Sequence, residues 1–95
     1  MAAWNFFTNY GHVIFILSSC PRMPLREVAL NVGITERAVQ KIISDLEAGG
    51  FIKIKKEGRN NSYKVIGRKR LRHDIEKSCR IEDLVKVIDF EKKEF

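Results

Sequence analysis

Apolar residues spaced three and four apart predict a helix over residues 9–19, which either Thr8 or Asn9 can cap. These residues form a stripe along one side of the helix. Phe15 and Ile16 lie on the opposite side, so the helix is apolar on two faces. A helix of this kind is enclosed on both sides, either by its own domain or by a second subunit.

Two further helical stretches follow, separated by a glycine. The first begins at Pro24, whose missing N–H costs nothing at the first position of a helix, and it ends at Gly33, which can adopt the left-handed conformation. Thr35 can cap the next helix. Ala29 is small, as is required where two helices cross closely, and Val39 can pack the later helix onto the earlier one. Together these features predict a helix-turn-helix.

After Gly50 the period of the pattern changes from helical to two, which predicts strands. Residues 51–56 partly alternate apolar residues with lysine, and residues 62–66 mirror them, with the turn-rich segment 57–61 as the tip of a hairpin. Apolar residues at i, i+3, i+4 and i+7 over 81–88 predict a last amphipathic helix. The expected fold is α+β, a winged helix-turn-helix with three helices, a hairpin wing and a C-terminal helix. We expect a DNA-binding domain over 1–74 and a dimerising helical segment over 75–95.

The exposed face of the third predicted helix carries side chains that can read DNA. Arginine can bond guanine through two hydrogen bonds, glutamine can do the same for adenine, and lysine reaches phosphate or guanine. A plain helical hairpin in a core is the alternative, but a merely solvated helix would more often alternate glutamate and lysine. The predicted contacts on this helix are Thr35, Glu36, Arg37, Gln40, Lys41 and Ser44.

Positive charge is concentrated in one part of the chain. The sequence has 18 Lys and Arg against 12 Asp and Glu, a net charge of +6. Residues 51–74 hold nine basic and two acidic residues, so this stretch alone accounts for the excess. A solvated face usually mixes the two signs. The distribution favours a polyanionic partner.

The hairpin is therefore predicted as a second DNA-binding element. A cation and two amides near its tip can contact phosphate or enter a minor groove, although asparagine and glycine favour turns whether or not they bind. The connector 67–74 is either a further source of phosphate contacts or an idle linker. The predicted contacts on the hairpin are Lys55, Arg59, Asn60, Asn61 and Lys64.

Part of the sequence resembles a known family. The run Gly-Ile-Thr-Glu-Arg-Ala-Val-Gln over 33–40, with Gly58-Arg59 in the hairpin and Arg72-His73 after it, resembles small prokaryotic winged helix-turn-helix transcriptional regulators of the MarR/ArsR-like group. The resemblance covers roughly 8–74 and implies a DNA-binding regulator, usually dimeric. Wings of this group often read Gly-Arg-Arg-Asn-Arg-Tyr. Asn60 and Ser62 replace two of those arginines here, which implies a weaker contribution from the wing.

The sequence shows no pattern of catalytic or metal-ligating residues. Cys20 and Cys79 lie far apart, and neither they nor the two histidines, His12 and His73, form the close ligand pairs of a structural zinc site. Metal-sensing members of the family carry cysteine-rich motifs on the DNA-reading helix, and this helix has none. The histidines and scattered carboxylates form no acid–base or nucleophile pairing. We expect no enzyme activity, no metal and no cofactor, and two reduced thiols.

A membrane location is not expected either. The segment 17–20 looks like the motif that precedes an acylated cysteine, but no charged residue precedes Arg22, and the apolar run 13–17 is too short for a signal peptide or a membrane span. We expect a cytoplasmic protein.

Two alternative functions remain open. Winged helices also serve as protein–protein modules, in which the third helix is typically buried or loses its basic face. Charge alone does not separate a sequence-specific DNA binder from a non-specific nucleic-acid binder. Excess apolar surface on the first helix, at residues 4–7 and over 81–88 also predicts a homodimer, the commonest closed assembly.

Overall fold

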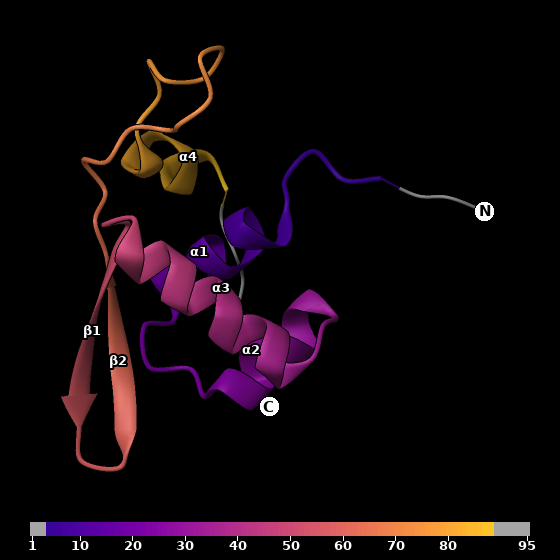
Figure 1. Ribbon diagram of the computed structural model, residues 1–95, viewed down its shortest axis with the longest axis vertical. Helices are drawn as coiled ribbons and strands as arrows, with labels where there is room; N and C mark the ends of the chain where they lie inside the picture. Colours follow the sequence, from indigo (N-terminus) through magenta and orange to yellow (C-terminus); the bar gives the residue numbers. More distant parts are fainter. Residues whose placement is uncertain (1–3, 89–95) are drawn as a thin grey trace.

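The elements follow one another in the order expected of a winged helix. The computed structural model describes residues 4–88. Within them the order is α1 (Asn9–Ser19), α2 (Leu25–Val32), α3 (Glu36–Ala48), β1 (Ile52–Glu57), β2 (Asn60–Val65) and α4 (Ile81–Val87) (Figure 1). The two strands form an antiparallel hairpin that projects from the helices, and the expected fold is confirmed.

Helix α1 lies at the centre of the core. All five residues of the run Val13–Leu17 are buried, and because this run exceeds one helical turn, the helix is enclosed on every side. Its neighbours are α2, α3 and β2. Both apolar faces of α1 are therefore covered within the chain, and along this run they do not call for a second subunit.

The turn between α2 and α3 depends on two residues. Gly33 has φ +88°, and its N–H donates to the carbonyl of Ala29 at 2.8 Å, which closes α2. A side chain at this left-handed position would strain the backbone, although no atom would clash with it. The hydroxyl oxygen of Thr35 accepts a hydrogen bond from the N–H of Ala38 at 3.0 Å and so caps α3. Pro24 stands one position earlier than expected, as the residue before α2 rather than its first.

The hairpin turn is tighter than the sequence suggested. The register runs from Ile52 opposite Val65 to Glu57 opposite Asn60, so only Gly58 and Arg59 form the loop. The expected five-residue tip over 57–61 is wrong. Gly58 has φ +66°, and a glycine with positive φ at the first loop position allows a two-residue hairpin turn, which leaves the neighbouring asparagines free to join the strand.

The C-terminal helix packs on the same core. The N–H of Ile81 donates to the carbonyl of Lys69 at 2.9 Å, and the Ile81 side chain is buried. The carboxylate of Asp83 accepts from the N–H of Arg80 at 3.0 Å and closes the first turn of α4. The division of the chain at residue 74 and a dimerising role for 75–95 remain predictions. Residues 89–95 of that segment lie outside the described part of the chain.

Candidate nucleic-acid interface

Helix α3 presents a polar face to solvent and an apolar face to the core. Val39, Ile42, Ile43 and Leu46 are buried on one side. The predicted reading residues, Arg37, Gln40, Lys41 and Ser44, are all exposed on the other. The helical period explains this division, because residues three and four apart share a face.

The first turn of α3 adds two side chains. The Thr35 hydroxyl accepts its capping bond, so its O–H remains able to donate to a phosphate oxygen. Glu36 is exposed, and its carboxylate can only accept. It therefore suits the amino group of cytosine and would repel a phosphate.

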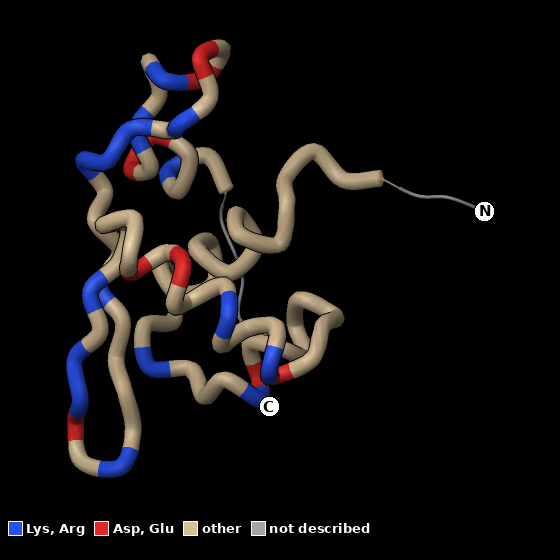
Figure 2. Tube along the Cα trace, in the orientation of Figure 1, with Lys and Arg blue, Asp and Glu red and all other residues tan. Residues whose placement is uncertain are grey.

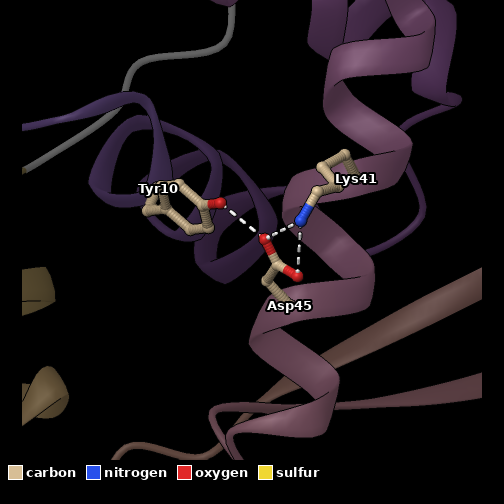
Figure 3. Close-up of polar contacts among 3 residues, drawn as sticks. All are labelled: Tyr10, Lys41 and Asp45. Atoms are coloured by element: carbon tan, nitrogen blue, oxygen red, sulfur yellow. Dashed lines mark hydrogen bonds and ion pairs between the residues drawn. The ribbon is translucent and has the colours of Figure 1, made fainter.

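Lys41 is held by an acidic neighbour (Figure 3). Its Nζ donates to both oxygens of Asp45, at 3.1 and 2.9 Å, and the Oη of Tyr10 in α1 donates to Oδ2 of the same carboxylate at 2.6 Å. The Tyr10 hydrogen bond, followed by that of Lys41, lowers the pKa of Asp45. The same carboxylate raises the pKa of Tyr10 and of Lys41.

Sequence reasoning missed this network of Tyr10, Lys41 and Asp45. The spacing of Lys41 and Asp45, four apart on a helix, was visible in the chain. Tyr10 lies 35 residues from Asp45, and only the packing of α1 on α3 brings them together.

Basic residues are frequent along β1 and at the tip of the wing (Figure 2). On one face of the hairpin, Lys53 stands directly opposite Lys64 in the register, and Lys55 lies two residues further along. All three side chains are exposed. Like charges directly opposite one another destabilise a sheet, and an anion between them would remove that cost. Lys53 was not among the predicted contacts, although its alternation with Ile52 and Ile54 could have indicated it.

The predicted wing contacts divide between the two faces of the hairpin. Arg59 is exposed in the loop, and Asn60 is exposed beside it. Asn61 pairs with Lys56 on the face opposite the lysine row, so the structure does not group it with Lys55 and Lys64.

The single acidic residue of the wing, Glu57, is held by cations. One carboxylate oxygen lies 3.1 Å from Nη2 of Arg22, in the connection before α2, and the other lies 3.9 Å from Nζ of Lys55. Arg22 thus joins the basic surface at the wing, which nothing in the local sequence had suggested. The exposed pair contributes little to stability.

An apolar cleft of about 350 Å³ lies away from the wing. It is enclosed by the N-terminal residues, α1, the second half of α3 and the 71–84 segment. Its lining includes Phe6, Phe7, Phe15, Leu71, Ile81 and Leu84.

Cys20 and Cys79 are free thiols. Within 4–88, no three His, Cys, Asp or Glu residues are grouped so as to hold a metal ion. No helix in that range has the length and apolarity needed to cross a bilayer.

Part of the chain is similar to a known family and to a solved structure. Residues 11–53 match a family model described as winged helix-turn-helix DNA-binding. No curated protein matches the sequence. Among solved structures, the chain is similar to the zinc-dependent MarR family transcriptional regulator AdcR in its Zn(II)-bound state, with 22% identity and a TM-score of 0.47 over 67% of this chain. That match spans only 46% of the other chain. The observed order of helices and strands is that of a winged helix-turn-helix, and the family model of that fold matches the segment from α1 to the start of β1.

Proposed function

We propose that the protein binds double-stranded DNA in a sequence-specific manner and regulates transcription from it. The observation that carries the proposal is the outward face of α3, which exposes Arg37 and Gln40 near its N-terminal end. Neither side chain makes a hydrogen bond or an ion pair within residues 4–88. In helix-turn-helix proteins the N-terminal residues of the second helix contact base edges in the major groove.

The wing would contact the DNA backbone beside this groove. The opposed lysines Lys53 and Lys64 give the outer face of the hairpin a charge arrangement that phosphate would stabilise. Lys55 and Asn60 would extend the same contact, and Arg59 would reach furthest because it lies in the loop. Contacts of this kind position a protein on DNA and carry no base information.

The two alternative functions predict different binding behaviour. Fragments bound by the protein would be selected from the host genome, and affinities for a selected and a scrambled duplex would be compared across salt concentrations. A sequence-specific binder discriminates by about 10³-fold or more, whereas a non-specific binder treats both duplexes alike. Absence of binding to either duplex would favour the protein-interaction alternative.

We further propose that two copies associate through the apolar surface around the cleft. Trp4 is 76% exposed and Phe6 88% exposed, with their rings edge to face at 5.1 Å, and Val87 of α4 is 78% exposed. These aromatic and aliphatic side chains gain from burial against a second copy. A two-fold dimer would place the two α3 helices on half-sites ~34–36 Å apart.

Sedimentation should show a dimer at micromolar concentration, either free or on DNA. The Phe6→Ser variant should shift the equilibrium towards monomer, because it removes an exposed ring. Leu30→Ser, which alters a 75% exposed leucine of α2, is the matched control and should leave the equilibrium unchanged. A monomer under both conditions would contradict the dimer.

Arg59→Ala should weaken binding to selected and scrambled duplexes to a similar degree. Its guanidinium would act as a positional cation, so its loss should reduce the slope of log K against log[salt] by about 1 per wing. Lys86→Ala on α4 removes one exposed cation remote from the wing and should leave the slope unchanged. An altered base preference in Arg59→Ala would instead show that the wing reads sequence.

A further inference from the structure

The connector that follows the wing is fastened to the start of α4 by backbone hydrogen bonds. The N–H of Ile81 donates to the carbonyl of Lys69 at 2.9 Å, and the N–H of Glu82 donates to that of Gly67 at 2.9 Å. Because these backbone groups are paired, the connector holds its side chains in defined positions, which a loose linker would not do.

Two of these side chains line a hollow at the base of the wing. The hollow has a volume of about 410 Å³ and is lined by residues of α3, β1 and the connector, which meet there (Figure 1). Three cations line it: Lys53 from β1, and Arg68 and Lys69 from the connector. One carboxylate, that of Glu47, also lines it, so the four charges sum to +2. Within residues 4–88 none of the four side chains forms an ion pair, so the excess positive charge of the hollow is not neutralised there.

The ammonium group of Lys69 is held against an aromatic ring. Its Nζ lies 5.2 Å from the centroid of the Phe51 ring, which is a cation–π distance. The side chain also passes over Gly50, where a Cβ would lie 3.6 Å from both Cε and Nζ of the lysine. A cation–π contact uses none of the acceptors of an anion, so the ammonium N–H groups remain able to donate. Lys69 is therefore positioned before an anion binds.

The hollow borders both surfaces that are proposed to contact DNA. Lys53 lines the hollow and also stands on the wing opposite Lys64. Glu47 lines it and shares the exposed face of α3 with Gln40 and Ser44, because residues three and four apart lie on one face. Along the helix axis Glu47 lies about 10 Å beyond Gln40. A major groove is about 12 Å wide, so a helix that reads bases with Gln40 would bring the hollow to the backbone beside the groove.

We propose that this hollow holds a phosphate group of the DNA backbone, which makes the connector a third DNA-binding element beside α3 and the wing. The proposal rests on the function proposed above. Arg68 and Lys69 donate to the phosphate oxygens, and Lys53 joins the hollow to the phosphate contacts of the wing. Glu47 opposes the contact by its charge. Phosphate contacts carry no base information, so the hollow strengthens binding to every duplex alike.

Substitutions in the hollow should change affinity in opposite directions according to the charge that they remove. Arg68→Gln should weaken binding to a selected and a scrambled duplex to the same degree, roughly fivefold at 0.15 M salt, and reduce the slope of log K against log[salt] by about 0.9. Arg68→Lys keeps the charge and should keep the wild-type slope. Glu47→Gln should strengthen binding to both duplexes by up to about fivefold, the range of one exposed charge interaction.

Arg72→Gln separates a contact in the hollow from a general effect of charge. Arg72 is exposed in the same connector but lines the apolar cleft instead of the hollow, so its loss should leave the slope close to the wild-type value. Arg68 is exposed as well, and its replacement should leave the fold intact. Equal losses of affinity in Arg68→Gln and Arg72→Gln would overturn the proposal.

Ethylation of single phosphates in the selected duplex locates the contact. An ethyl group removes the negative charge of a phosphate, so ethylation of a contacted phosphate weakens binding. At least one phosphate should have this effect on the wild type and lose it with the double variant Arg68→Gln, Lys69→Gln. If each phosphate whose ethylation weakens the wild type weakens the double variant equally, the hollow holds no phosphate, and this proposal fails while the proposed function stands. If the wild-type protein binds neither duplex, both fail.

Discussion

Leu17→Ala is expected to lower the free energy of unfolding by about 2–5 kcal/mol, because it removes a fully buried side chain and leaves a cavity. Leu17 is 0% exposed in α1, the helix that contacts α2, α3 and β2. Domains of this kind are stable by only about 5–15 kcal/mol, so the substitution removes a large fraction of the total. The melting temperature should fall by at least about 8 °C, since each kcal/mol corresponds to about 4–8 °C in a domain of this size.

Urea unfolding of the wild type and the variant, at one fixed protein concentration, measures this loss. The concentration must be held constant because a dimer would add concentration-dependent stability. Leu30→Ala is the matched control: Leu30 is 75% exposed on α2, and its loss should change stability by no more than about 0.5 kcal/mol. If Leu17→Ala costs no more than Leu30→Ala, α1 is not enclosed as the structure describes.

The helical part of the fold could be predicted because its signals are local. Gly33 and Thr35 determine where α2 ends and α3 begins, through backbone conformation and a hydrogen bond to a residue three positions away. The hairpin was located correctly but its turn was not, because asparagine at 60 and 61 fits either a turn or a strand, and the pairing with β1 decides between them. The two apolar faces of α1 were recognised, but only the assembled domain shows that its own elements cover both.

The candidate interface likewise has features that the sequence predicts and contacts that only the folded chain shows. The exposure of Arg37, Gln40 and Ser44 follows from the helical period alone. The contacts from Tyr10 to Asp45 and from Arg22 to Glu57 join residues 35 positions apart, and no local pattern encodes them. Tertiary packing therefore determines which charged groups near α3 and the wing are already paired.

Arg37→Ala is expected to weaken binding to a selected duplex by about 1–3 kcal/mol per half-site and to relax the preference at one base position. Arg37 is exposed near the N-terminal end of α3 and has no partner within residues 4–88, so its guanidinium is available for two hydrogen bonds to one guanine. On a scrambled duplex the loss of affinity should be smaller, because Arg37 contributes only its positive charge to binding there. Affinities of wild type and variant on both duplexes, with each base pair of the site varied in turn, measure the effect.

Arg37→Lys separates the reading of a base from a contact with phosphate. Lysine keeps the positive charge but lacks the planar pair of donors, so the variant should retain the wild-type salt slope and still lose the base preference. Full recovery of preference in Arg37→Lys would instead show that Arg37 acts as a charge on the backbone. If Arg37→Ala weakens both duplexes equally while Arg59→Ala alters base preference, the wing reads the sequence and α3 holds the backbone. If neither substitution changes duplex affinity, the protein-interaction alternative is favoured over DNA binding by α3 and the wing.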